Sequence, residues 1–131
     1  MSTITDQSLD VQGLREIYGA AWAAHDADGI AKLHTEDTHF QTHIGLPPVA
    51  GRDAMRTACA QIFEQYENFR PETRHALYGA RHWVLEWTLH ATTAGKDFSV
   101  DCIDVVVLSD EGLVASKDTY MDAAQLQSAL G

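Results

Sequence analysis

Two residues of opposite charge, Asp104 and Lys117, flank a predicted β-hairpin near the end of the sequence. The turn is expected at residues 109–112, where Ser-Asp-Glu-Gly separates two runs rich in β-branched residues. Counting outward from this turn in steps of two places Asp104 directly opposite Lys117, on the same face of the sheet. A carboxylate and an amine that meet in an apolar interior favour each other's ionised forms. The pattern therefore predicts an anionic Asp104, as a candidate general base, with Lys117 as its electrostatic partner.

Two alternatives to this pairing stay open. In the first, the hairpin is shifted by one residue, which would turn one of the two side chains to the other face of the sheet. In the second, the side chain of Lys117 extends to the opening of the pocket, where its amine stays solvated. The face that carries the pair also carries four candidate pocket residues, which are Cys102, Val106, Thr119 and Met121.

An aromatic pocket is the expected surrounding of this pair. In residues 82–93, large apolar side chains alternate with more polar ones, as in a strand with one buried face. The candidate lining residues are Trp22, Phe40, Trp83, Leu85, Trp87 and Leu89. Three tryptophans on two elements favour a ligand-sized cavity over a fully packed interior, although the same residues would also serve as core.

The histidines give no metal motif. His39 and His43 share a face of one predicted strand, but four residues of strand span about 13 Å, which is too far for one ion. His43 is a possible acid/base group only if it turns inward from the following loop. Nothing resembles a phosphate loop or a dinucleotide fingerprint, so we expect neither a metal nor a cofactor.

The elements that must position these residues follow from periodicity and turn signals. Apolar residues spaced as on one helical face predict a helix over 8–25, with Tyr18 on its buried stripe. Asp26 or Asp28 is placed to cap the N-terminus of a short second helix. Asp122 is placed to cap a short C-terminal helix. The remaining expected elements are a strand over 37–44, a helix over 53–67, and strands over 70–78, 82–93, 98–108 and 113–121. The buried stripe expected on the helix over 53–67 consists of Met55, Ala58, Cys59, Ile62 and Tyr66. Helices followed by consecutive strands indicate the α+β class.

Composition narrows the classes of function. The chain has 131 residues, which suits a single domain over 1–131, and it carries 9 basic and 19 acidic residues for a net charge of −10. Such a charge disfavours nucleic acids and anionic membrane surfaces as partners. No apolar run reaches the roughly 20 residues that span a bilayer. The first ten residues are polar and lack the basic and apolar segments of a secretion signal. Two cysteines are too few for a disulfide scaffold, so we expect a cytoplasmic protein.

Four stretches, taken in order and spacing, resemble the nuclear transport factor 2-like superfamily, and most closely its ketosteroid isomerase-like and SnoaL-like branch. They are VQGL from Val11 with Tyr18 after it, DADGI from Asp26, PPVAGR from Pro47, and VDCIDV from Val100 with DEGL and Tyr120 after it. The resemblance covers most of the chain. It implies a curved antiparallel sheet wrapped around N-terminal helices, which encloses a conical apolar pocket (a cystatin-like α+β roll). It also implies a homodimer through the outer sheet face.

The resemblance implies roles for several residues. In ketosteroid isomerases a tyrosine and a protonated aspartic acid polarise the substrate carbonyl, and these positions fall on Tyr18 and Asp104. The proton-transferring aspartate falls on Thr42, which cannot act as a base near pH 7. Two supporting tyrosines fall on His34 and Cys59, and His34 could hydrogen-bond Tyr18.

Together these features predict an enzyme that transfers a proton within an apolar, carbonyl-containing small molecule, as an isomerase, dehydratase or cyclase does. Tyr18, Asp104 and Lys117 are the candidate catalytic residues, with His34 and His43 as possible acid/base groups. Thr42 and Cys59 join the candidate lining of the pocket. The alternative is a ligand-binding or dimerisation module without catalysis on the same fold, which the missing carboxylate at Thr42 favours.

Overall fold

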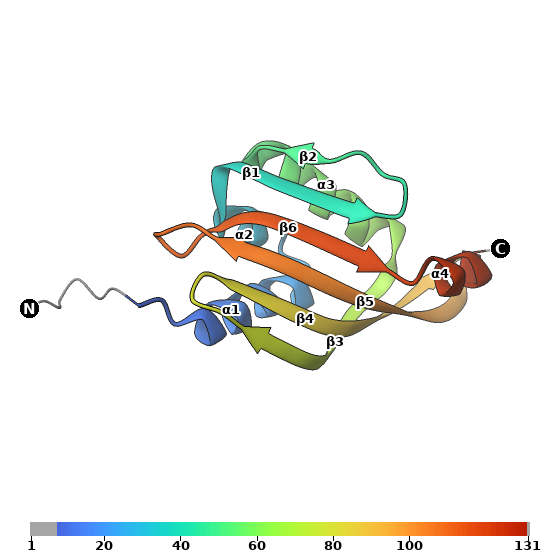
Figure 1. Cartoon of the computed structure of the whole chain (residues 1–131). Coiled ribbons are helices and arrows are strands. Elements are labelled where there is room, and N and C mark those ends of the chain that lie inside the picture. The colour runs from blue at the N-terminus through green and yellow to red at the C-terminus, as the bar shows by residue number, and fades with distance from the viewer. Residues whose placement is uncertain (1–7, 131) are drawn as a thin grey trace, which may run out of the picture.

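The computed structural model describes residues 8–130; the expectations for residues 1–7 lie outside this range. Helices and strands follow the predicted order, with one short strand added (Figure 1). The helices are α1 (Val11–Ala23), α2 (Ala27–Lys32), α3 (Arg52–Gln65) and α4 (Ala123–Leu130). The strands are β1 (His34–His43), β2 (Val49–Ala50), β3 (Glu67–Tyr78), β4 (His82–Thr93), β5 (Lys96–Leu108) and β6 (Val114–Met121).

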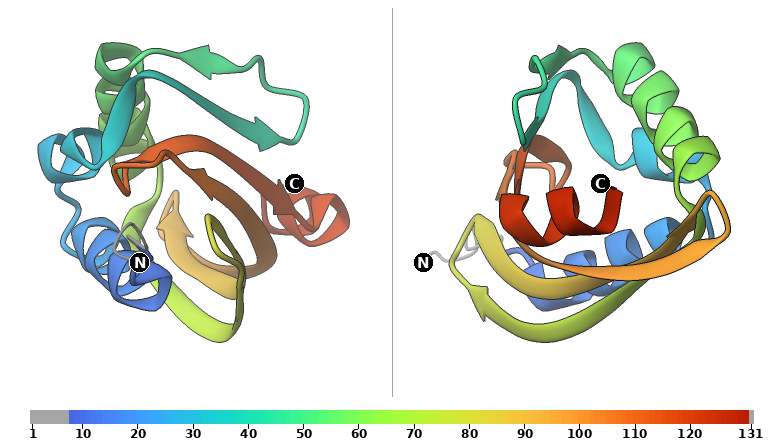
Figure 2. Two further views of the ribbon diagram at one scale, coloured as in Figure 1. Left: turned by 60° about the vertical axis from the view of Figure 1, so that its left-hand side comes forward. Right: turned by 90° about the vertical axis from the view of Figure 1, so that its right-hand side faces the viewer.

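The six strands form one sheet in the order β2-β1-β6-β5-β4-β3. The long strands curve, and α1 lies inside the curve (Figure 2). The expected α+β class and curved sheet are confirmed, but the sheet is mixed, because β1 runs parallel to β6. Strand β6 enters the sheet between β1 and β5. It can run parallel to β1 because the two strands are distant in sequence and are not joined by a hairpin.

Aspartate side chains cap the N-termini of the first two helices and set the residues at which these helices begin. The Asp10 side chain accepts a hydrogen bond of 3.0 Å from the backbone N–H of Gly13, so α1 begins at Val11 rather than at the expected residue 8. Helix α1 buries Tyr18 and Trp22 against the sheet. Asp26, one of the two predicted caps, accepts from the backbone N–H of Gly29 and starts α2.

Helix α3 spans one side of the sheet's concave face (Figure 2). It begins after Gly51, whose φ of 96° lies in the left-handed region that glycine tolerates. Its fully buried residues are Met55 and Cys59, which belong to the predicted stripe. Among residues 8–130, no helix is long and apolar enough to cross a membrane.

The register of the β5–β6 hairpin differs from the prediction. Asp104 pairs with Thr119, and Lys117 pairs with Val106. Two one-residue shifts cause the difference: the ladder begins with Leu108 opposite Val114, one residue later on β6 than the turn predicts, and a bulge between Val107 and Leu108 adds a second residue on β6. Lys117 and Asp104 are therefore diagonal neighbours on the same face rather than direct partners.

Candidate active site

Two cavities, each of about 340 Å³, lie between the helices and the concave face of the sheet. We call them chamber 1 and chamber 2. Their linings share four residues, Trp22, Phe69, Trp87 and Lys117. The single conical pocket expected from the sequence is therefore divided, and the shared side chains form the dividing wall.

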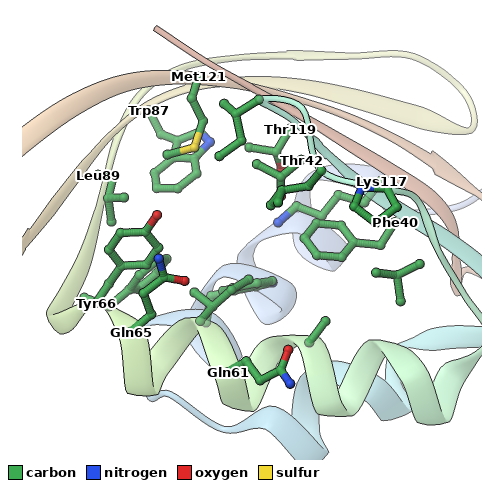
Figure 3. A pocket seen from close by; sticks show the side chains of 18 residues that line it. Phe40, Thr42, Gln61, Gln65, Tyr66, Trp87, Leu89, Lys117, Thr119 and Met121 are labelled. Carbon is green, nitrogen blue, oxygen red and sulfur yellow. The ribbon is translucent and has the colours of Figure 1, made fainter. Parts of the chain in front are cut away.

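Chamber 1 lies between α3 and strands β1, β4 and β6 (Figure 3). Gln61, Gln65 and Tyr66 stand on the helix side, while Lys117 points its amine into the cavity from the sheet. Seven of the predicted pocket residues line it, namely Trp22, Phe40, Thr42, Trp87, Leu89, Thr119 and Met121. Lys117 is the only charged residue in its lining, so chamber 1 contains no carboxylate and no histidine.

Chamber 2 lies between α1 and strands β3 and β4. Its lining includes the remaining predicted aromatic and apolar residues, Trp83 and Leu85, together with Tyr18 and Asp104. All three predicted catalytic residues, Tyr18, Asp104 and Lys117, thus border chamber 2, and only Lys117 also borders chamber 1.

The amine of Lys117 occupies an aromatic box in the dividing wall. Its Nζ atom lies 4.0 Å from the ring centre of Trp22, 5.3 Å from that of Phe40 and 5.7 Å from that of Tyr18. Rings at these distances stabilise a cation through their negative faces. Within residues 8–130 this amine donates no hydrogen bond, and its side chain is only 5% exposed. Its N–H groups can therefore serve a ligand in either chamber.

The carboxylate of Asp104 is held by two hydrogen-bond donors and by one ion pair. Oδ1 accepts hydrogen bonds from the indole N–H of Trp87 at 3.0 Å and from the hydroxyl of Thr119 at 2.8 Å. Oδ2 lies 3.7 Å from the Nζ atom of Lys117. An indole nitrogen can only donate, so this arrangement suits an anionic acceptor rather than the neutral donor that the family resemblance implies. Oδ2 is the oxygen that remains available to a ligand.

Tyr18 begins a chain of buried hydrogen bonds. Its hydroxyl lies 2.8 Å from Nε2 of His34, and Nδ1 of His34 lies 2.7 Å from the hydroxyl of Thr38. Thr38 donates its proton to the backbone oxygen of Val114 at 3.2 Å. Thr38 must then accept from Nδ1–H, which leaves Nε2 as the acceptor of the Tyr18 proton. The predicted contact between His34 and Tyr18 is present, and it directs the tyrosine hydroxyl away from the chamber.

Burial shifts the ionisation of these groups. Burial, helped by the positive charges of Lys117 and Arg52, lowers the pKa of His34 to about 3, so its imidazole is neutral at pH 7. Burial raises the pKa of Tyr18 well above its ordinary value. It also raises the pKa of Cys59 to about 11 and that of Cys102 to about 12, so neither thiol is a nucleophile near neutral pH.

Four other predicted site residues lie outside both chamber linings. Cys59 and Val106 are fully buried in the core, and Cys102 borders a shallow depression that opens on the outer face of the sheet. His43 does not face a chamber, because its ring stacks on Tyr120 at 4.2 Å and its Nε2 atom bonds Asp118 at 2.8 Å.

Sequence reasoning missed several lining residues. Tyr66 is on the predicted helix stripe and carried the signal, but Gln61 and Gln65 are polar residues without a motif. The loop before β2 contributes Leu46 and Pro47, which no periodic pattern marks. Across residues 8–130, no group of three or more His, Cys, Asp or Glu residues could hold a metal ion.

Comparison with solved structures identifies the fold. The chain is similar to a hypothetical protein with a ketosteroid isomerase-like fold from Catenulispora acidiphila DSM 44928, which was crystallised in complex with trimethylamine (TM-score 0.80, 17% identity, 88% of this chain and 90% of that chain). It is also similar to a putative SnoaL-like polyketide cyclase from Shewanella denitrificans OS-217 (TM-score 0.79, 16% identity, 92% of this chain and 96% of that chain). The fold is thus that of the nuclear transport factor 2-like proteins.

The family follows from the sequence match. Residues 14–117 match the model of the SnoaL-like domain, and the chain belongs to this family. Members of one fold carry out different functions, so the activity must be argued from the site.

Proposed function

We propose that this protein is an enzyme that transfers a proton within an apolar, carbonyl-containing small molecule, as an isomerase, dehydratase or cyclase does. The observation that carries the proposal is the ion pair between Asp104 and Lys117, buried at the wall between two apolar chambers. Buried charges are costly unless they are paired, and such groups cluster at functional sites.

In the proposed reaction, the substrate enters chamber 2, because Asp104 borders only that chamber. The substrate carbonyl accepts a hydrogen bond from the amine of Lys117. Oδ2 of Asp104 then removes a proton from the carbon next to the carbonyl, while Trp87 and Thr119 hold Oδ1 in place.

The count of buried charges supports the roles of Asp104 as the base and of Lys117 as the group that contacts the substrate oxygen. Before the transfer, Lys117 faces one anion, the carboxylate of Asp104. After the transfer, the carboxyl group is neutral and the negative charge lies on the substrate oxygen, which Lys117 also contacts. The number of buried charges stays the same, so the site stabilises the enolate without new desolvation. Tyr18, whose proton is committed to His34, supports the aromatic box in this mechanism.

The test is exchange of α-protons of small cyclic ketones, with 2-tetralone first, in D₂O followed by NMR. The protein should accelerate exchange, and Asp104→Asn should slow it roughly 10²–10⁴-fold, as expected for loss of a positioned base. Asp37→Asn removes the same charge at an exposed position on β1 and is the matched control. Equal rates in the wild-type and Asp104→Asn proteins would refute the proposal, as would the absence of any acceleration.

A second candidate function is ligand binding without catalysis, and chamber 1 favours it. Its lining lacks a carboxylate and a histidine, and Thr42 stands where the family resemblance implies an aspartate. Binding of a ketone in chamber 1 with no exchange of its α-protons would support this function.

We also propose that the chain forms a homodimer through the outer face of the sheet. This face, opposite Asp104, exposes Ile103, Val107 and Tyr120, each 40% exposed or more. Light scattering should give twice the chain mass of 14.4 kDa. Ile103→Lys should convert the dimer to a monomer, and a monomeric wild-type protein would contradict the proposal.

A further inference from the structure

The mouth of chamber 2 carries a positive charge that the proposed proton transfer does not use. Arg15 extends from α1 into the lining of this chamber. Its Nε atom donates a hydrogen bond of 2.8 Å to the hydroxyl of Tyr78, at the end of β3. Gly19, one turn further along α1, lies beside the guanidinium, since a Cβ atom there would be in ordinary contact with Nη1 of Arg15 at 3.9 Å. The guanidinium is therefore fixed at the mouth by a neutral partner.

The charge of Arg15 is not compensated by a neighbouring carboxylate. Within residues 8–130, Arg15 forms no ion pair, although Glu16 also borders chamber 2. The bond to Tyr78 uses one of its five N–H groups. The two terminal nitrogens of a guanidinium match the two oxygens of a carboxylate in a bidentate contact.

The two ends of chamber 2 thus offer different polar groups. Asp104 and Lys117 lie at the wall shared with chamber 1, and Arg15 lies on the α1 side. Between them the lining is apolar, with Phe69, Trp83 and Leu85. A volume of about 340 Å³ is at the lower end for small-molecule pockets, which suits a body of one or two rings.

Chamber 1 differs at the corresponding place. Its polar groups away from Lys117 are neutral, and they include the side chains of Gln61 and Gln65. A carboxylate on a ligand would therefore find a cationic partner opposite the reacting end only in chamber 2.

We infer that the substrate of chamber 2 is a keto acid, an apolar one- or two-ring carbonyl compound whose carboxylate is bound by Arg15 while its carbonyl contacts Lys117. This inference rests on the proposed function and names its substrate class. Arg15 is then a specificity-determining residue, which selects acids in a protein whose net charge of −10 otherwise repels them.

The test compares two enolate mimics by isothermal titration calorimetry. 2-Naphthol carries the phenol alone, and 6-hydroxy-2-naphthoate carries a carboxylate on the second ring. The wild-type protein should bind the acid about tenfold more tightly than 2-naphthol, as expected for one charge-assisted pair. Arg15→Gln should abolish this preference, so that the two mimics bind with similar affinity.

Three further variants keep the result interpretable. Arg56→Gln removes the same charge from an exposed site on α3 and should keep the preference. Tyr78→Phe keeps the charge of Arg15 but frees its side chain, so it should reduce the preference by less than Arg15→Gln does. Glu16→Gln removes the opposing charge at the mouth and should increase the preference.

The outcomes separate this inference from the proposed function. An unchanged preference in Arg15→Gln overturns the inference, as does a preference that only Lys117→Met removes, because the carboxylate would then bind at the wall. The proton-exchange rates of Asp104→Asn decide the proposed function separately. If exchange is absent but the preference depends on Arg15, chamber 2 is an acid-binding site without the proposed reaction.

Discussion

Chamber 1 and chamber 2 have equal volumes and share four wall residues, yet their chemistry differs, because Asp104, the carboxylate paired with Lys117, borders only chamber 2. Asp104 and Tyr18 border chamber 2, whereas chamber 1 meets only the amine of Lys117. Chamber 1 can thus bind a ligand oxygen but has no group to remove a proton. A cavity of suitable size and apolarity is therefore not sufficient evidence of catalysis, because the base must border the same space as the substrate.

The largest expected effect concerns Lys117, the only charged residue that both chambers share. Lys117→Met leaves Asp104 buried without its partner, which should reduce the free energy of unfolding by about 3–5 kcal/mol in urea denaturation. Combining it with Asp104→Asn should recover much of this loss, and Lys96→Met, at the exposed start of β5, should have little effect. If the loss in the double variant equals the sum of the two single losses, the residues are not coupled.

Thr42→Asp would give chamber 1 the carboxylate that it lacks. Thr42→Asp should isomerise 3-cyclohexen-1-one, a one-ring β,γ-unsaturated ketone that suits a chamber of about 340 Å³, about 10²-fold faster than the wild-type protein does, which is the lower end of what a positioned base contributes. Ultraviolet absorbance of the conjugated product measures the rate. Thr42→Asn, which has similar size but no base, is the control, and an equal gain in both variants would mean that the carboxylate is not responsible.

Filling each chamber separately tests where the reaction occurs. Leu85→Trp narrows chamber 2 and should slow the proposed α-proton exchange about tenfold, because the reacting geometry is lost. Ala58→Trp narrows chamber 1 and should leave the rate close to that of the wild type. Near-ultraviolet circular dichroism verifies that both variants are folded. The reverse pattern would move the reaction to chamber 1.

The effect that is smallest near neutral pH concerns His34, whose Nε2 atom bonds the hydroxyl of Tyr18 in the lining of chamber 2. Its pKa is about 3 in the folded protein and 6.5 ordinarily, so between these values only the unfolded chain takes up its proton. The free energy of unfolding should therefore fall with decreasing pH, by up to about 1.4 kcal/mol per pH unit from this group. His34→Gln should flatten the profile relative to the wild type, with exposed His39→Gln as control. An unchanged slope in His34→Gln would contradict the assignment.

Periodicity and turn chemistry predicted the elements well. The stripe containing Tyr18 and Trp22, the cap at Asp26 and the alternation in β4 each depend on a few neighbouring residues, so the sequence displays them directly. The face shared by Asp104 and Lys117 was also predicted. Their direct pairing was wrong by two residues, because the first pair after the turn involves Val114 rather than Leu113 and a bulge adds one more residue to β6, whereas counting from the hairpin assumes a regular ladder.

The division into two chambers could not be predicted in this way. It depends on how far the side chains of Trp22 and Lys117 extend from different elements, which residue spacing does not encode. The role of Thr38 was missed for a similar reason. Its contact with His34 matters only because a backbone oxygen of β6 lies close enough to accept its proton, and that strand is 76 residues away in sequence.

The position of β6 in the sheet has a consequence for the synthesis of the chain. This strand is the last of the six strands in sequence, yet it lies between β1 and β5 and carries Lys117 and Thr119. Until it emerges from the ribosome, β1 and β5 each lack a partner along one edge, and such edges promote aggregation. Lys117, which pairs with Asp104, also lies on this strand and is therefore absent until the strand has been synthesised. The sheet is therefore completed only with its last strand, and a chain truncated before residue 114 would lack both the strand that joins β1 to β5 and the Lys117 amine shared by the two chambers.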